Sequence, residues 1–448
     1  MPLRPHGTEP MGTNGEGKLD GDWDRLVSRD RGAAMSDQSS RHVMFEEVRT
    51  VTKSTGAQSP SLGVLARSRK PNERRLPIHP EHLSRIDSQV RSRIFLEHGY
   101  GSDFDVTDDT LAGLVGGVGT REQVVAQCDV VLLPKVQAED LAELTEGQIV
   151  WGWPHCVQNF DLTQTAIDRR LTLIAFEAMN HWRADGGFGL HVFHKNNELA
   201  GYCSVLHAMQ LTGRTGSYGR RLRAAVIGFG ATARGAVTAL NAHGVDDVRV
   251  LTNRDVAAVG SPIPSTQIIQ MGPDPAAPET IWANTPDGHI LVADLLTEND
   301  IVVNCVLQDP SAPLVFVTED DLAAFAPGSL IVDVSCDTGM GFSWAHPTSF
   351  DEPISRMANG LHYYAVDHSP SYLWNSATWE ISEALLPHID TVLAGPPAWD
   401  ADQTIRRAIE IRDGVVLSSG ILSFQNRGEA YPHGVRSADR IPTDRLNP

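Results

Sequence analysis

The sequence predicts an α/β protein with two Rossmann-like, doubly wound parallel sheets, the second inserted within the chain of the first. Two observations support this fold class. From residue 59 onward, apolar runs of strand length alternate with helical patterns. After a long helical pattern over residues 196–213, a glycine-rich turn opens a second series of short apolar runs. Each series therefore predicts a parallel sheet with helices on both faces.

The predicted elements follow one another in a regular order. Before the glycine-rich turn, we expect strands at residues 61–67, 93–99, 129–135, 148–153 and 171–179, and helices at residues 79–90, 121–128 and 138–144. After the turn, we expect strands at residues 248–251, 300–307, 330–335 and 362–366, and a helix at residues 376–395. The remaining tail is expected to return to the first sheet.

The glycine-rich turn has the spacing of a dinucleotide-binding loop. Gly228, Gly230 and Ala233 follow an apolar strand and open a helical pattern. The first glycine permits a tight turn, the second lets a pyrophosphate approach the backbone, and the small third residue lets the helix pack on the strand. The phosphates would lie at the helix N-terminus.

These patterns predict a domain organisation. Residues 197–368 are expected to form an NAD(P)-binding Rossmann domain, inserted in a catalytic domain of residues 59–196 that residues 369–448 complete. Residues 1–58 mix Gly, Ser, Asp and Arg without apolar periodicity, so we expect a disordered extension.

The end of the second strand in the nucleotide-binding unit decides the expected cofactor. An NAD site usually places a carboxylate there to bind the ribose, whereas an NADP site offers a cation. No carboxylate stands between Thr252 and Arg254. Arg254 can bind a 2′-phosphate with two parallel hydrogen bonds, and Asn253 can add another. We predict NADP(H) as the preferred cofactor, with NAD(H) as the alternative if Asp255 binds the ribose.

The composition argues against several kinds of partner. A formal net charge of −19 argues against nucleic acid and anionic membranes, because both require basic surfaces. The five cysteines are widely spaced and show no metal-ligand pattern, so no metal site is predicted. No apolar run approaches the roughly 18 residues of a membrane span, and no secretory leader is recognisable. We expect a cytoplasmic protein that acts on small molecules.

Several motifs resemble one superfamily. The order of the stretches NERRLPIHP, VLLPK, WGWPHCVQN, NNELAGYCSVLHAMQ, the glycine loop, VNCVLQDPSAPLVFV, LIVDVSCDTGMGF and AVDHSPSYLW is similar to that in the alanine dehydrogenase, transhydrogenase and lysine-forming saccharopine dehydrogenase superfamily. Within it, GWPHCVQN, NNELAGYCSVLHA and DVSCDTGMGF most resemble the carboxyethylornithine synthase family. The resemblance covers residues 60 to about 430.

The resemblance implies a reductive condensation in a homo-oligomeric enzyme. Pyruvate, or another 2-oxo acid, and the side-chain amine of L-ornithine or a similar amino acid would form an imine. NADPH would reduce this imine to a secondary amine. Such a reaction needs a cation for the carboxylate of the 2-oxo acid, a group that polarises its carbonyl and an acid/base group.

Two cations match family positions. Arg75 occupies the position of the family's carboxylate-binding arginine, and a guanidinium fork matches a carboxylate with two parallel hydrogen bonds. Arg74 would take this role if the register were shifted by one residue. Lys135 stands where the family has a lysine that touches the 2-oxo acid, where a cation would stabilise negative charge on the carbonyl oxygen. The alternatives are a surface arginine and a strand-end lysine in solvent.

His155 and Asp337 complete the set of catalytic residues that the resemblance implies. His155 stands at the position of the family's acid/base histidine. A primary amine with a pKa of about 10.4 is mostly protonated at neutral pH, so a group that titrates near neutrality is suited to accept its proton. Asp337 resembles the family's aspartate beside the nicotinamide, and Asp333 is the structural alternative. Thr338 stands where close relatives often carry an acid, which leaves the anchors of the amine unassigned.

Val306, Leu307 and His368 fall where the family packs the nicotinamide ring. The alternative is that the two apolar residues belong to the core and that His368 is a turn histidine.

Three other functions remain open. An alanine dehydrogenase would use ammonia in place of ornithine, although the missing carboxylate before Asp255 and the HCV after GWP argue against it. A saccharopine-dehydrogenase-like imine reductase would join a 2-oxo acid to another amine, because selectivity can reside in a few pocket residues. A non-catalytic NADP-binding sensor would keep the fold alone, and the presence of Arg75, Lys135, His155 and Asp337 argues against it.

Overall fold

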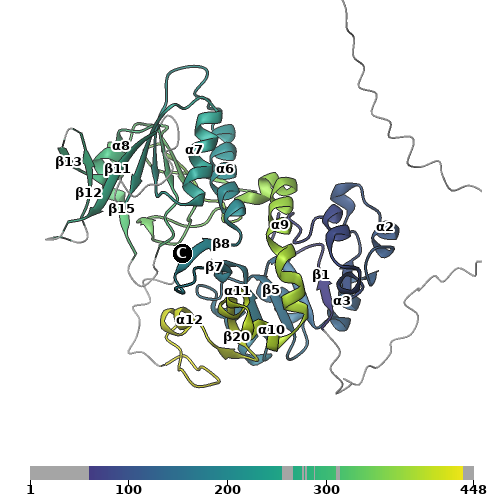
Figure 1. Cartoon of the computed structure of the whole chain (residues 1–448). Coiled ribbons are helices and arrows are strands. Elements are labelled where there is room, and N and C mark those ends of the chain that lie inside the picture. Colours follow the sequence, from purple (N-terminus) through teal and green to yellow (C-terminus); the bar gives the residue numbers. More distant parts are fainter. Residues whose placement is uncertain are drawn as a thin grey trace, which may run out of the picture. The chain divides into compact units, whose positions relative to one another are not determined.

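The structure, a computed structural model, describes residues 60–254, 266–274, 277, 280–286, 288–308 and 313–436. The predicted extension, residues 1–58, therefore lies outside the described residues. The described residues belong to one compact unit, Thr55–Pro448, and form two large sheets (Figure 1).

The first sheet contains eight strands within the described residues, in the order β21-β20-β6-β5-β4-β1-β2-β3. Strands β1 to β6 are parallel, and β20 pairs with β6 in the antiparallel sense. The strand order reverses between β1 and β4. The strands are β1 (Leu62–Val64), β2 (Ile94–Glu97), β3 (Gly117–Gly119), β4 (Val130–Lys135), β5 (Ile149–Trp153), β6 (Thr172–Ala175), β20 (Ile409–Arg412) and β21 (Val415–Val416).

The second sheet contains nine strands in the part of the chain that is described, in the order β13-β12-β11-β10-β9-β14-β16-β19-β18. The six strands from β11 to β19 in this order are parallel, and the strand order reverses between β9 and β14. The strands are β9 (Arg223–Ile227), β10 (Asp247–Thr252), β11 (Thr266–Pro273), β12 (Ile281–Thr285), β13 (Gly288–Leu291), β14 (Ile301–Asn304), β16 (Leu330–Asp333), β18 (Ile354–Arg356) and β19 (His362–Tyr364).

Two strand pairs and the helices complete the fold. The pairs are β7 (Asn180–Trp182) with β8 (Phe188–His191), and β15 (Val315–Val317) with β17 (Gly341–Phe342). The α-helices are α1 (Ser88–Arg91), α2 (Asp108–Ala112), α3 (Arg121–Gln127), α4 (Ala138–Ala142), α5 (Phe160–Asp168), α6 (His194–Leu211), α7 (Ala231–Ala242), α8 (Val292–Thr297), α9 (Trp374–Leu393), α10 (Pro396–Ala401), α11 (Gln403–Ala408) and α12 (Ser419–Phe424). The 3-10 helices are η1 (Pro80–Arg85), η2 (Ser102–Phe104), η3 (Phe176–Ala178), η5 (Glu319–Ala324) and η6 (Ser369–Leu373).

The C-terminal part of the chain packs on the first sheet. Ile381 and Leu385 of α9 and Ile405 of α11 belong to the same buried cluster as Leu62 and Val64 of β1. By contrast, the buried residues of α6 and α7 pack with the strands of the second sheet. The chain therefore leaves the first sheet after β6, builds the second sheet, and returns to the first at β20.

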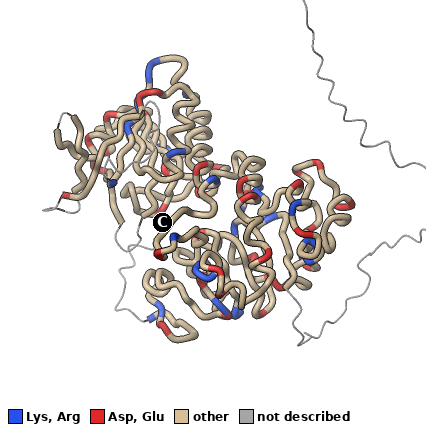
Figure 2. The backbone as a smooth tube through the Cα atoms, in the orientation of Figure 1, with Lys and Arg blue, Asp and Glu red and all other residues tan. Residues whose placement is uncertain are grey.

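The predicted fold class, two Rossmann-like sheets with one inserted in the other, is confirmed. The sheets are mixed rather than purely parallel, because β20, β12, β13 and β18 add antiparallel edges that the apolar pattern did not indicate. Lys and Arg are interspersed with Asp and Glu along the described chain (Figure 2). Among the described helices, none combines the length and the apolar character that crossing a membrane requires.

The single helix predicted at residues 79–90 is wrong. The structure has η1 and α1 there, separated by Ile86 and Asp87, whose backbones are extended. The side chain of Asp87 accepts a hydrogen bond from the backbone N–H of Gln89 at 2.8 Å, so it caps a new helix rather than continuing the old one.

Helices α6 and α7 lie side by side on the second sheet (Figure 1) and approach through two glycines. A Cβ atom added at Gly201 would lie 1.9 Å from the carbonyl oxygen of Thr232, and one added at Gly235 would lie 1.8 Å from that of Glu198. These distances are far inside van der Waals contact. The close approach therefore fixes α7, the helix that follows the glycine loop, against α6.

We expect Gly235→Ala to lower the free energy of unfolding by about 1–3 kcal/mol, because the helices must move apart. In an open helical position the same change would stabilise by about 1 kcal/mol. Urea-induced unfolding measures the difference. Gly272→Ala is a matched control, since its added Cβ meets no atom within 4 Å. An unfolding midpoint for Gly235→Ala at or above that of the unmodified protein would contradict the close packing.

Candidate active site

One cavity of about 630 Å³ gathers most of the predicted catalytic residues. Lys135, His155 and Asp337 line it, together with Leu307. Its volume lies in the range that small-molecule sites usually have. A second hollow of about 530 Å³, beside β11–β13, contains none of the predicted site residues. The first cavity is therefore the candidate active site.

Lys135 is the last residue of β4, so the strand itself carries its side chain to the carboxyl edge of the first sheet. Its Nζ atom donates no hydrogen bond to any described residue. Burial lowers the pKa of Lys135, the charges of Arg75 and Lys70 lower it further, and Asp367 opposes this change. Lys135 therefore offers an uncommitted donor inside the cavity.

His155 follows β5 in a left-handed backbone conformation with φ of 48°. Its backbone N–H donates to Oε1 of Glu177 at 2.7 Å, and its Nδ1 atom lies 3.8 Å from the same oxygen. A left-handed conformation costs free energy in a residue that has a side chain. The hydrogen bond to Glu177 offsets part of this cost. Burial, and then the charge of Lys135, hold the pKa of His155 well below its usual range. The imidazole is therefore neutral at pH 7.

Asp337 and Asp333 have different environments. Asp333 is fully buried and accepts hydrogen bonds from Asn304, Tyr363 and the backbone of Cys336. Burial raises its pKa to about 6. Asp337 lines the cavity and accepts a hydrogen bond from Gln158 at 3.0 Å. Burial raises the pKa of Asp337, and the Gln158 contact opposes this change. The hydrogen bond from the backbone of Cys336 to Asp333 thus fixes the turn just before Asp337, which lines the cavity.

The cavity also contains an ion pair that the sequence analysis missed. Nζ of Lys70 donates to Asp367 at 2.8 Å, and both side chains line the cavity. Asp367 also accepts a hydrogen bond from Nδ1 of His368 at 2.6 Å, while Nε2 of His368 lies 3.0 Å from the carbonyl oxygen of Pro71. Although burial opposes it, these contacts and Lys135 hold the pKa of Asp367 well below its usual range. His368 itself is buried and does not line the cavity.

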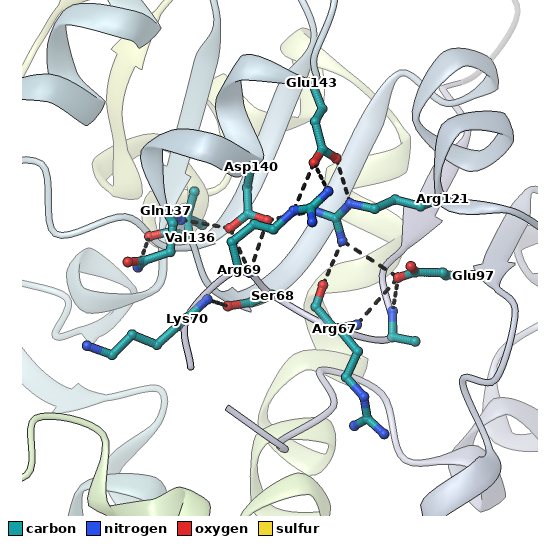
Figure 3. A network of polar contacts seen from close by, with 11 residues as sticks. Arg67, Ser68, Arg69, Lys70, Glu97, Arg121, Val136, Gln137, Asp140 and Glu143 are labelled. Atoms are coloured by element: carbon teal, nitrogen blue, oxygen red, sulfur yellow. Dashed lines mark hydrogen bonds and ion pairs between the residues drawn. The ribbon is translucent and has the colours of Figure 1, made fainter. Parts of the chain in front are cut away.

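A network of ion pairs fixes the segment that carries Lys70 (Figure 3). The guanidinium of Arg121 binds Asp140 at 2.6 Å, Glu143 at 2.6 Å and the carbonyl oxygen of Arg67 at 2.7 Å. Asp140 also accepts a hydrogen bond from the backbone N–H of Arg69 at 3.2 Å. Because these contacts hold the backbone immediately before Lys70, its side chain is directed by a rigid segment rather than by a free loop.

Arg75 lies behind the cavity wall rather than on it. Its guanidinium binds Glu73 through Nε at 2.8 Å and Nη2 at 2.5 Å, and Nη1 donates to Asn196 at 3.2 Å. Burial would raise the pKa of Glu73, but Arg75 lowers it to about 2. The alternative residue, Arg74, is exposed and stacks on Trp374. The guanidinium of Arg75 is therefore already bound by Glu73. That Arg75 binds the carboxylate of a substrate stays a prediction.

The glycine loop fits a dinucleotide. Gly228 has φ of 106°, a conformation that favours glycine, and lies beside Cys305 and Val306 at the point where the strand order reverses. Gly230 precedes α7 without a side-chain cap, and a Cβ atom there would meet no atom within 4 Å. Ala233 is a buried residue in the first turn of α7. The loop thus leaves open space at uncapped N–H groups, where phosphates bind.

The remaining predicted cofactor residues are dispersed around this loop. Asn253 and Arg254 are exposed just past the end of β10, and the alternative ribose ligand, Asp255, lies outside the described residues. Val306 is partly buried, whereas the side chain of Leu307 is 92% exposed although it borders the cavity. Exposure of a large apolar side chain beside a ligand cavity is consistent with a ring-packing surface rather than with core packing.

Sequence reasoning missed Lys70, Asp367 and Gln158, which the structure places in the cavity. One signal was available: the chain has only five lysines, and Lys70 follows the first strand. Nothing in the local sequence indicates that Lys70 and Asp367, which are 297 positions apart, form a pair.

The fold and the cavity define an NAD(P)-dependent oxidoreductase, and comparison with known proteins identifies its family. The model described as "Alanine dehydrogenase/PNT, N-terminal domain" matches residues 63–200, and "Alanine dehydrogenase/PNT, C-terminal domain" matches residues 208–419. The chain belongs to the alanine dehydrogenase/PNT family.

Individual relatives are distant but extend over most of the chain. An N(5)-(carboxyethyl)ornithine synthase of Lactococcus lactis subsp. lactis is 23% identical over 336 residues, which cover 72% of this chain and 93% of the relative. An alanine dehydrogenase of Halomonas elongata is 26% identical over 352 residues, covering 74% and 86%. The solved structure of an L-alanine dehydrogenase matches with a TM-score of 0.63 at 18% identity, covering 81% and 98%, which supports the fold.

We expect Lys135 to react faster than Lys195 with a small acylating reagent near pH 8. Burial lowers the pKa of Lys135, whereas the hydrogen bond to Glu198 raises that of Lys195, and only the neutral amine is nucleophilic. Mass spectrometry of digested protein measures both rates, with Lys135→Arg to assign the peptide. The rate ratio should fall as the pH rises and Lys195 loses its proton. Equal rates across the pH range would contradict the lowered pKa.

Proposed function

We propose that this protein catalyses the NADPH-dependent reductive condensation of pyruvate, or another 2-oxo acid, with the amine of an amino acid, the side-chain amine of L-ornithine being the first candidate. The observation that carries the proposal is the gathering of Lys135, His155 and Asp337 in one cavity, which is also lined by Leu307, directly after the residues that lie beside Gly228. The likeness to N(5)-(carboxyethyl)ornithine synthases from two genera supports the choice of amine.

Each residue of the cavity has a chemical role in this proposal. The neutral imidazole of His155 accepts a proton from the substrate ammonium, which frees the amine to attack the carbonyl. The uncommitted Nζ atom of Lys135 donates to the carbonyl oxygen and stabilises its developing negative charge. Asp337 accepts a hydrogen bond from the amine and orients it. The bound nicotinamide supplies the hydride, and loss of water from the carbinolamine requires a proton that His155 returns.

The preference for NADPH rests on the end of β10. Arg254 and Asn253 are exposed there, and Thr252 is buried, so no carboxylate among these residues would repel a 2′-phosphate. Arg254 is thus suited to bind that phosphate with its guanidinium fork.

An alanine dehydrogenase is the second candidate, favoured by the 26% identity to the Halomonas elongata protein. In that case ammonia would replace the amino acid, and the same three cavity residues would act on it. A saccharopine-dehydrogenase-like reaction would use the same residues with a different 2-oxo acid and amine.

NADPH oxidation with pyruvate should require ornithine and should be slower with lysine, with ammonia, or with NADH as the reductant. Absorbance at the NADPH band measures each rate, and 2-oxoglutarate with lysine tests the saccharopine-like reaction. Turnover with ammonia alone would establish the alanine dehydrogenase instead. A protein that binds NADPH but turns over none of these amines would favour a sensor.

Arg254→Ala should lower kcat/KM for NADPH by about 10- to 100-fold, because a charge-assisted hydrogen bond contributes about 1.5–3 kcal/mol. The value for NADH should stay nearly unchanged, since NADH lacks the 2′-phosphate. Arg249→Ala is a matched control: Arg249 lies on β10, the strand that Arg254 follows, and pairs with Glu298. An equal loss with both cofactors would contradict the assigned contact.

A further inference from the structure

The residues that line the candidate cavity form an interior and a rim. Lys135, His155 and Asp337 are partly buried, whereas Phe160 and Asp161 are exposed, and all five line the cavity. Phe160 and Asp161 are the first two residues of α5, the helix that follows the His155 loop. A ligand that fills the cavity therefore extends from the interior toward the start of α5 at the rim.

The charged side chains of the interior leave one cation and one carboxylate without an oppositely charged hydrogen-bond partner. Lys70 and Asp367 bind one another, with Nζ of Lys70 donating at 2.8 Å. Lys135 has no hydrogen-bond partner among the described residues. The carboxylate of Asp337 accepts a hydrogen bond from the neutral amide of Gln158 at 3.0 Å. Lys135 and Asp337 are thus the interior charges that a ligand can engage.

Asp161 adds a second carboxylate, at the rim, that its own helix does not use as a cap. The N-cap of α5 is Asn159, whose side chain accepts a hydrogen bond from the backbone N–H of Leu162 at 3.1 Å. Only the backbone carbonyl of Asp161 is engaged, by the hydroxyl of Thr165 at 2.8 Å. Its carboxylate has no hydrogen bond and no ion pair with any residue that the structure describes.

The two carboxylates belong to neighbouring parts of one wall. Gln158, which binds Asp337, precedes Asp161 by three residues, and all three residues line the cavity. A carboxylate without a cationic partner attracts a positively charged group of a ligand. The wall therefore offers places for two such groups, one in the interior and one at the rim.

The size of the cavity agrees with a ligand that reaches the rim. Its volume is about 630 Å³, which corresponds to about 20 water molecules at roughly 30 Å³ each. Pyruvate and ammonia would fill a small part of this space and would leave Asp161 without a partner. An amino acid with a second amino group extends far enough to approach both carboxylates.

We propose that Asp161 determines the class of amine substrate by binding a second ammonium group, remote from the amine that reacts. The 2-oxo acid then lies at Lys135, the reacting amine at Asp337 and the second ammonium group at Asp161. The substrate class is a diamino acid, rather than ammonia or a monoamine. This inference rests on the proposed function, because that function places the reacting amine at Asp337.

Asp161→Asn tests the assignment with two ligands that differ in one group. 5-Aminopentanoate is ornithine without its α-amino group. We expect the variant to raise KM for ornithine by about five- to tenfold, the upper range for an ion pair that water still reaches, with kcat nearly unchanged. KM for 5-aminopentanoate should stay the same, because this ligand has no second ammonium group. Asp161→Glu should retain the preference for ornithine.

Asp168→Asn is a matched control on the same helix. Asp168 is exposed, accepts a hydrogen bond from Gln164 at 2.9 Å and does not line the cavity, so neither KM should change. A carboxylate in the first turn also stabilises a helix through the helix dipole. Loss of that effect alone would act on both ligands alike. Equal changes for the two ligands, or no change with Asp161→Asn, would therefore overturn the proposal.

Calorimetric titration of ornithine and 5-aminopentanoate into the protein with bound NADP⁺ needs no turnover. If no amine is turned over but Asp161→Asn weakens the binding of ornithine alone, the proposed function is refuted and the role of Asp161 is supported. If ornithine is turned over and the variant discriminates as the unmodified protein does, only the role of Asp161 is refuted. Absence of ornithine binding to the unmodified protein would refute both.

Discussion

The reversal of strand order in each sheet is the constraint on which the site depends. In the first sheet the order reverses between β1 and β4, and in the second between β9 and β14. A crevice opens at such a point because the connections on either side run to opposite faces. Lys70 follows β1, Lys135 ends β4, and Gly228 follows β9 beside the residues after β14. The topology itself thus positions the candidate catalytic and cofactor-binding residues.

This arrangement brings several positively charged side chains together, and acidic side chains neutralise two of them. Lys70 and Lys135 both line the cavity, and Arg75 lies behind it. Burial lowers the pKa values of Lys135 and His155, and the neighbouring cations lower both further, because each cation disfavours protonation of its neighbours. Asp367 binds Lys70, and Glu73 binds Arg75, so two of the three cations are engaged and Lys135 is left as the free donor.

The sequence predicted the parts of the site whose signals are local. The glycine loop and the strand-end position of Lys135 follow from spacing and from an apolar run, because a turn and a strand are determined by neighbouring residues. The position of His155 came from the family resemblance. The engagement of Arg75 by Glu73, the Lys70 pair with Asp367 and the antiparallel edges could not be predicted, since they depend on which distant segments pack together. The apolar pattern at residues 79–90 predicted one helix where the structure has two, because the spacing of apolar residues does not indicate where the helical backbone is interrupted.

The insertion of one domain in the other lets the last part of the chain contact the loop that carries His155. The loop after β5 has a left-handed residue at His155, a conformation that costs free energy. Its supports are Glu177, on η3 just after β6, and Gln425, which lies 269 positions after Cys156. Because β20 joins the sheet next to β6, the first sheet is complete only after the second has been built. The conformation of His155 is therefore coupled to closure of the whole chain rather than to the first half-sheet in which the residue lies.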